Sequence, residues 1–212
     1  MTASTDVHLP TPERRRVAAS VALALLEVIQ QQDHPTEVFE DEDVSRTLPR
    51  RLGLSEVVDR QVRQYRENAR RGHKLTDSEL AELMKLVLKR PDSPEVFFEV
   101  GGRLAGELTG SMVRMLPGGL KTLVLKGRIS KRLRRLFGRR IGAFAPGPFA
   151  LEGSALPFVQ VDPGGDACHL VAGFCQRALR DAFGKEVLVV EQSCEARGDS
   201  VCRWAMVEAS NG

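Results

Sequence analysis

The chain has 212 residues, of which 42% are hydrophobic and 28% are charged, and its formal net charge is +3. This composition is typical of a folded chain long enough for one sizeable domain, or for a domain with a helical extension. Such a small net charge does not indicate a nucleic-acid partner, and we expect none. The longest largely apolar run, residues 17–26, is shorter than the ~20 residues of a membrane-spanning helix. We therefore also expect no transmembrane segment.

The first 92 residues show the patterns of a short tail followed by amphipathic helices. Residues 1–10 are polar, and we expect a disordered tail there. Three or four short helices are predicted over residues 11–92, because apolar positions recur at helical spacing between start and stop signals. These signals are Thr11-Pro12, Asp33-His34-Pro35, Gly72, Thr76-x-x-Glu79 and Pro91. The sequence thus predicts a helical extension over residues 11–92 and a second domain over residues 93–212.

A row of glycines marks the start of the second domain. A helix is predicted from Glu95, and it would carry Gly102, Gly106 and Gly110 at four-residue spacing. Glycine in a helix interior costs roughly 1 kcal/mol relative to alanine, so such a row indicates close packing against another backbone. That backbone could belong to a second copy, giving a homodimer, or to another helix of the same chain. We predict the homodimer and keep the intramolecular crossing as the alternative.

The most basic part of the chain follows, over residues 121–140. Nine lysines and arginines occur there without any acidic residue, and they alternate with apolar residues at near-helical spacing. The segment is therefore predicted to be a basic amphipathic helix. Three alternatives stay open for its charges: pairing with the acidic segment 37–43, peripheral contact with an anionic membrane surface, or binding of ligand carboxylates. The residues expected to make ligand or membrane contacts are Arg128, Arg132 and Arg135.

The C-terminal stretch holds all four cysteines of the protein. A helix is predicted from an N-cap at Asp166 to a stop at Gly184, and this places Cys168 in the first turn, where the helix dipole favours a thiolate. Two strands should follow, around residues 187–190 and 201–207, joined by a turn at residues 196–200.

Such a hairpin would bring three cysteines together as metal ligands. Cys194 and Cys202 would meet at its closed end, and a helix packed across its face could add Cys168. Glu191 would complete a set of three sulfurs and one oxygen that suits zinc. Because positions i and i+3 of a regular strand face opposite sides, Glu191 can join Cys194 only if the strand ends or bulges between them.

Two other interpretations of the cysteines remain open. All four could be buried core thiols, since the chain has no Cys-x-x-Cys pair. Disulfides are the other alternative, although no secretory signal precedes them, and we expect a cytoplasmic protein. Cys175 lies roughly 10 Å along the helix axis from Cys168, too far to share an ion. We expect it to be a buried small hydrophobic residue.

The pattern Cys168-x25-Cys194-x7-Cys202, with Glu191 three residues before the second cysteine and the turn Ala196-Arg197-Gly198-Asp199, resembles the 4-vinyl reductase domain family. The resemblance covers about residues 140–208. This family is related to the fold of the TRAPP vesicle-tethering subunits, and it includes a bacteriochlorophyll-biosynthesis protein and the sensing domains of phenol and xylene regulators. The resemblance implies an α+β fold, in which an antiparallel sheet is flanked by helices, here with the N-terminal helical extension.

The resemblance also implies a metal site and a ligand site. The sensors hold a structural zinc through three cysteines and a glutamate, which implies Cys168, Glu191, Cys194 and Cys202 here. It further implies a cavity for a small hydrophobic or tetrapyrrole-like molecule. The side chains that could line this cavity are Phe144, Phe149, Leu151, Phe158 and Phe174, although core packing would use the same residues. The His and Trp that bind the hydroxyl in the phenol sensors are missing from this region, which argues against a phenol ligand.

Function is expected to follow from binding. The sequence has no dinucleotide fingerprint, no P-loop and no convincing catalytic triad, and a metal with four protein ligands has no open position for catalysis. We predict a zinc-stabilised domain that binds a small hydrophobic or tetrapyrrole-like ligand as a carrier or sensor. The alternatives are an enzyme or accessory of (bacterio)chlorophyll 8-vinyl reduction, and a TRAPP-like dimeric scaffold without a ligand.

Overall fold

The computed structural model describes residues 13–33, 56–106, 108, 115–154 and 156–207. Its helices are α1 (Ala19–Asp33), α3 (Glu56–Arg70), α4 (Asp77–Leu88), α5 (Ser93–Ala105), α7 (Gly118–Phe137) and α8 (His169–Phe183), with short 3-10 turns η2 (Asp166–Cys168) and η3 (Glu195–Arg197). Its strands are β1 (Val17–Ala18), β2 (Lys74–Leu75), β3 (Ala143–Phe144), β4 (Ala150–Gly153), β5 (Leu188–Ser193) and β6 (Cys202–Val207).

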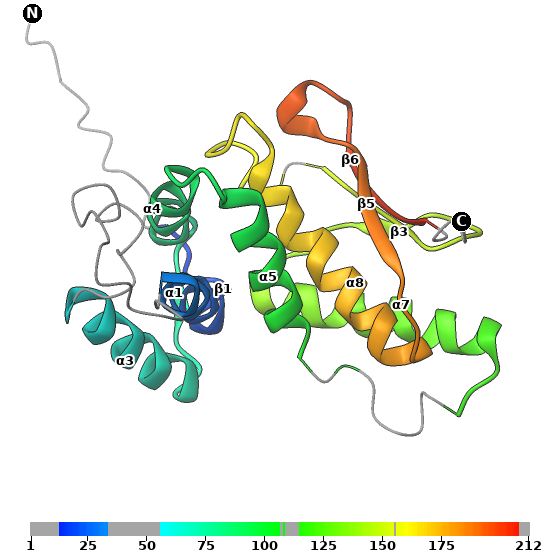
Figure 1. Cartoon of the computed structure of the whole chain (residues 1–212), viewed down its shortest axis with the longest axis horizontal. Helices are drawn as coiled ribbons and strands as arrows, with labels where there is room; N and C mark the ends of the chain where they lie inside the picture. Colours follow the sequence, from blue (N-terminus) through cyan, green and yellow to red (C-terminus); the bar gives the residue numbers. More distant parts are fainter. Residues whose placement is uncertain (1–12, 34–55, 107, 109–114, 155, 208–212) are drawn as a thin grey trace, which may run out of the picture.

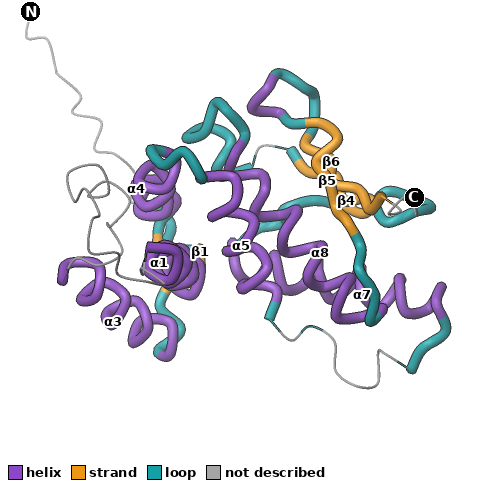
Figure 2. The backbone as a smooth tube through the Cα atoms, in the orientation of Figure 1, coloured by secondary structure: helices purple, strands orange, loops and turns teal. Residues whose placement is uncertain are grey.

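These elements are arranged in layers. The N-terminal helices α1, α3 and α4 form one side of the molecule, the four-stranded antiparallel sheet forms the other, and α5 and α8 lie between them (Figure 1). Figure 2 shows the same division between the helical part and the strands. The predicted α+β fold, an antiparallel sheet flanked by helices with an N-terminal helical extension, is confirmed. Among the described helices, none combines the length and the apolar composition that crossing a bilayer requires.

The predicted helical extension is present, and its local signals act as expected. The Thr76 hydroxyl accepts a hydrogen bond from the Glu79 N–H at 3.1 Å, and the Glu79 carboxylate accepts one from the Thr76 N–H at 2.7 Å. This reciprocal pair is a capping box, which satisfies two backbone donors at the start of α4. Gly72, after the end of α3, has a φ of +69°, which glycine adopts without a steric penalty.

The first helix begins later than its cap sequence predicted. It was expected to start at Thr11, but α1 starts at Ala19, and Thr11 and the predicted tail lie outside the described residues. Val17 and Ala18 form β1 instead, which pairs antiparallel with β2. The Arg16 N–H also donates to the Leu75 carbonyl at 2.8 Å. Because these backbone groups are hydrogen-bonded to β2 and its flank, they are not available to a helix.

Helices α5 and α8 cross at unusually close range. A Cβ added at Gly101 would lie 1.9 Å from the Leu170 carbonyl oxygen, and one added at Gly173 would lie 1.9 Å from the Phe98 carbonyl oxygen. Any side chain at either position would therefore push the two backbones apart. The pair of glycines fixes α8 against α5, and α8 in turn carries the first cysteine of the predicted metal site at its start.

The predicted glycine row is only partly right. Helix α5 ends at Ala105, so Gly106 is not in the helix interior; it follows the last turn with a φ of +51°. Gly102 lies beside α8 at ordinary contact distance, and Gly110 lies outside the described residues. The close backbone contact is thus intramolecular and is made by Gly101, one residue away from the predicted row. The homodimer stays a prediction.

The basic segment is the predicted amphipathic helix, α7. Its buried residues follow one stripe: Leu125, Ile129, Leu133, Leu136 and Phe137. The helix ends at Gly138, whose φ is +65°. A Cβ there would lie 2.4 Å from the Arg16 carbonyl oxygen, so this glycine also allows α7 to pack beside β1. The acidic segment 37–43, one of the three expected partners of the basic residues, lies outside the described residues.

The C-terminal sheet has the strand order β3-β4-β6-β5, with every neighbouring pair antiparallel. Strands β5 and β6 form the predicted hairpin, and α8 packs against β5. One continuous hydrophobic cluster contains Val21 from α1, Val100 from α5, Leu170 from α8 and Trp204 from β6. The described helices of the extension therefore share their core with the C-terminal part. The domain boundary at residue 92 falls between α4 and α5 and remains a prediction.

Candidate metal centre

Three cysteines from three different elements meet where the β5–β6 hairpin closes over the start of α8. Cys168 is the last residue of η2, Cys194 follows the end of β5, and Cys202 is the first residue of β6. The Sγ atom of Cys168 lies 3.6 Å from that of Cys194 and 3.8 Å from that of Cys202. All three side chains are buried, with exposed fractions of 1% or less. None of them is in a disulfide.

Glu191 joins this cluster because β5 is irregular. The β5–β6 register shifts between Glu191 and Ser193: Glu191 pairs with Trp204, and Ser193 pairs with Arg203, the adjacent residue. One extra residue on β5, Gln192, thus lies within the bulge, and the strand ends before Cys194. This is the irregularity that the spacing of Glu191 and Cys194 required, so both side chains reach the same side.

The donor set fits a metal ion. One ligand atom from each of Cys168, Glu191, Cys194 and Cys202 lies within 4.8 Å of all the others. The Zn–S bond of about 2.3 Å and tetrahedral angles place two sulfur ligands about 3.8 Å apart, which agrees with the observed sulfur separations. The Glu191 side chain is only 4% exposed, and its Oε1 atom is buried without a hydrogen-bond partner. A buried carboxylate oxygen facing three thiols is a group that a cation would satisfy.

The three thiols differ in acidity. A hydrogen bond with Cys168 is the main cause that lowers the pKa of Cys202 to about 7, and the Glu195 N–H, which donates to the Cys202 sulfur at 3.3 Å, acts in the same direction. The same thiol pair raises the pKa of Cys168, with burial as the second cause. Burial also raises the pKa of Cys194. The sequence placed the thiolate at Cys168 through the helix dipole, but Cys202 is the sulfur that ionises most readily.

The turn between the strands holds the ligands in place. The Arg197 guanidinium donates to Oε2 of Glu191 at 2.5 Å, which leaves Oε1 directed to the cluster, and this hydrogen bond raises the pKa of Arg197. The Asp199 carboxylate accepts a hydrogen bond from the Cys194 N–H at 2.7 Å. Contacts of this kind, one shell outside the metal, orient ligating side chains and tune their affinity. The sequence analysis identified these residues only as a turn.

The loop before α8 contains two further positioning residues that the sequence analysis missed. Asp162 is 3% exposed, and its carboxylate accepts hydrogen bonds from the N–H groups of Gly164, Gly165 and Ala167. Asp162 therefore caps this helical start, a role that the sequence assigned to Asp166. Gly165, at a φ of +86°, lies so close to the cluster that a Cβ there would be 2.8 Å from the Cys194 sulfur. The string Asp162-Pro-Gly-Gly was the available signal for this loop.

Comparison with known proteins points to the same region. Residues 151–207 match the family model of the 4-vinyl reductase domain. The chain carries a 4-vinyl reductase domain. The match contains every residue of the cluster, from the loop before α8 to β6. No curated protein and no solved structure matches the chain.

The fourth cysteine of the 4-vinyl reductase domain is separate from the cluster, as predicted. Cys175 lies in the middle of α8, fully buried in the hydrophobic core. Burial raises the pKa of its thiol, so it stays protonated and behaves as a small apolar side chain.

The residues predicted to line a ligand cavity are placed mainly in the core. Phe149, Leu151, Phe158 and Phe174 are at most 2% exposed, and Phe144 is partly buried. Phe149 also lines an open groove of about 430 Å³ between α7, the loop before β4, the end of α8 and β6. The apolar side chains of this groove are Leu123, Phe149, Leu179, Phe183 and Met206. Among the five predicted residues, only Phe149 lines it, and the predicted cavity stays a prediction.

The three basic residues singled out in the sequence lie together. Arg128, Arg132 and Arg135 line a second pocket, of about 320 Å³, between α7 and the end of α5. This pocket shares no lining residue with the groove that contains Phe149.

Proposed function

We propose that this 4-vinyl reductase domain is a zinc-stabilised module that binds a small hydrophobic molecule as a carrier or sensor. One observation carries the proposal: three buried thiols and an otherwise unpartnered carboxylate oxygen converge within 4.8 Å. Soft thiolates with one carboxylate favour zinc over magnesium or calcium. Four free cysteines are compatible with a cytoplasmic protein, where thiols stay reduced.

The metal would have a structural role. Cys168, Cys194, Cys202 and Glu191 would hold it, and four protein ligands leave no open position for a water or a substrate. The cluster joins the start of α8 to both strands of the hairpin, so binding a metal there would fasten these elements together. Structural zinc of this kind can contribute ~10 kcal/mol or more to folding. This argues for a binding module rather than an enzyme.

The groove beside α7 supports the choice of a hydrophobic ligand. Five of its lining side chains are apolar, and Lys126 at its edge donates to the Gly147 carbonyl at 3.1 Å. A volume of about 430 Å³ is in the range of small-molecule sites. A tetrapyrrole-like ligand with carboxylates is less well supported, because the arginines expected to bind them line a different pocket.

A dimeric scaffold without a ligand is the second candidate. It is favoured by the packing of the residues that would otherwise form a cavity: Leu151, Phe158 and Phe174 are at most 1% exposed. The Phe158 ring also makes an edge contact with Phe137, with ring centroids 6.2 Å apart. A cavity at this place would require these side chains to move apart.

Titration with Nile red, a neutral apolar dye, distinguishes the two candidates. The binding module predicts saturable fluorescence enhancement by the wild-type chain and at least about tenfold weaker binding by Leu123→Glu, which introduces a charge into the groove. Leu188→Glu is the matched control, since Leu188 is also exposed but lies on β5 outside the groove, and it should bind like wild type. Absence of saturable binding, together with a stable dimer in light scattering, would favour the scaffold.

A further inference from the structure

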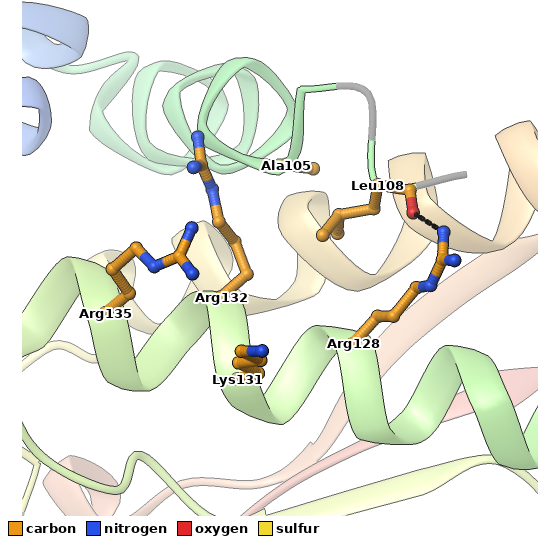
Figure 3. A pocket seen from close by; sticks show the side chains of 6 residues that line it. All are labelled: Ala105, Leu108, Arg128, Lys131, Arg132 and Arg135. Atoms are coloured by element: carbon orange, nitrogen blue, oxygen red, sulfur yellow. Dashed lines mark hydrogen bonds between the residues drawn. The ribbon is translucent and has the colours of Figure 1, made fainter. Parts of the chain in front are cut away.

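The second pocket is lined by a cluster of positive charges that the metal centre and the groove do not involve. Arg128, Lys131, Arg132 and Arg135 project from α7 toward the end of α5, and Ala105 and Leu108 form the opposite wall (Figure 3). Positions separated by three, four and seven residues share one face of a helix. Four like charges are therefore held side by side, an arrangement that is unfavourable until an anion neutralises it.

The hydrogen bonds of these side chains leave most of their donors unused. Arg128 donates to the Leu108 carbonyl at 2.7 Å, and Arg132 donates through Nε to the Leu104 carbonyl at 3.3 Å. Figure 3 shows the first of these bonds, and it shows Arg132 and Arg135 directed to the same space below α5. A guanidinium has five N–H donors, so each of these arginines retains donors for a ligand.

No carboxylate pairs with any of the four side chains within the part of the chain that the structure describes. Other basic residues nearby differ in this respect. Arg103 of α5 pairs with Glu27, and Arg139, just beyond α7, pairs with Asp77. The pocket is thus a place where positive charge is concentrated without the neutralisation seen around it. Glu107, the acidic residue nearest in sequence to Leu108, lies outside the described residues.

The geometry points to a ligand with more than one anionic group. The guanidinium fork matches the oxygens of phosphates and carboxylates and can bind them through two parallel hydrogen bonds. Arg128 and Arg135 are seven residues apart, about 10.5 Å along the helix axis, which is longer than a single phosphate can span. We propose that this pocket binds the linked phosphate groups of a polyphosphorylated ligand. Four cations match the charge of such a group better than that of a dicarboxylate.

This site is separate from the proposed function. It lies on a different flank of α7 from the apolar groove, and the two share no lining residue. Loss of phosphate binding would therefore leave the metal centre and the apolar site unaffected, and the reverse also holds.

Calorimetric titration of the full chain with inorganic pyrophosphate tests the proposal. Arg135→Gln is the informative variant, because Arg135 lines the pocket, and Arg134→Gln is its matched control, because Arg134 is exposed on the same helix and does not line it. We expect Arg135→Gln to weaken pyrophosphate binding about tenfold or more, which corresponds to the loss of one charge-assisted contact. Arg134→Gln should stay within about twofold of wild type, since a distant charge is largely screened in salt.

Two further arms settle the source of the phosphate and the part played by Glu107. Phosphatidylcholine vesicles containing phosphatidic acid replace pyrophosphate in the first: vesicle binding that Arg135→Gln abolishes and Arg134→Gln retains assigns the phosphate to a lipid headgroup. Glu107→Gln should bind pyrophosphate as tightly as wild type or more tightly. Absence of binding to both probes, equal weakening by Arg134→Gln and Arg135→Gln, or lost binding in Glu107→Gln would each overturn the proposal.

Discussion

Replacing Gly173 with alanine tests the packing that positions α8. The added Cβ would lie 1.9 Å from the Phe98 carbonyl oxygen, whereas ordinary contacts begin at 3.4 Å. Helices α5 and α8 must therefore separate by about 1.5 Å at this point, or the backbone must distort. Overpacking of a core costs about 1–3 kcal/mol, and a clash with backbone rather than with a flexible side chain belongs at the upper end. A loss of about 3 kcal/mol lowers the Tm of a chain of this size by roughly 6–12 °C.

The control is Gly127→Ala, in the middle of α7. An added Cβ there meets no atom within 4 Å, so alanine should raise stability by up to about 1 kcal/mol through its higher helix propensity. Both variants should be compared with wild type by thermal circular dichroism at equal metal content. A Tm for Gly173→Ala within about 2 °C of wild type, well below the expected shift, would refute the close-packing argument.

Three other substitutions probe the contacts around the core and the metal centre. Arg90→Met removes the guanidinium that binds the buried Asp33 carboxylate at 2.9 Å, and urea unfolding should show a loss of about 3–5 kcal/mol; a loss below about 1 kcal/mol would contradict this. Asp162→Asn disturbs three backbone hydrogen bonds and should cost about 1–3 kcal/mol in the same assay, so unchanged stability would exclude the capping role. Gly165→Ala crowds the Cys194 sulfur and should weaken zinc affinity about 10–100-fold in competition with a chromophoric chelator, while equal affinity would show that the loop does not restrain the site.

The sequence was most informative about the metal centre, where spacing and strand geometry together constrain the structure. Strand parity alone required an irregularity between Glu191 and Cys194, and the structure has a bulge there. The stop at Gly184 and the capping box at Thr76 were also predictable, because each depends on a local backbone requirement.

Features that depend on packing were not predictable in the same way. The glycine that contacts α8 is Gly101, because the packed face of α5 is decided by its partner helix and not by the spacing of glycines. Likewise, aromatic residues such as Phe158 and Phe174 satisfy a pocket pattern and a core pattern equally well, and here they are fully buried. The cap from Asp162 reaches forward over a loop, so no fixed spacing from the helix reveals it.

Elemental analysis of the purified chain, with zinc measured per polypeptide, tests the metal centre most directly. The comparison requires wild type, Cys194→Ser, Cys202→Ser and Cys175→Ser, the last as a matched control because Cys175 is equally buried but outside the cluster. We predict one zinc in wild type and in Cys175→Ser, and loss of the metal in the other two. A metal-free wild type, or full zinc content in both Cys194→Ser and Cys202→Ser, would contradict the account.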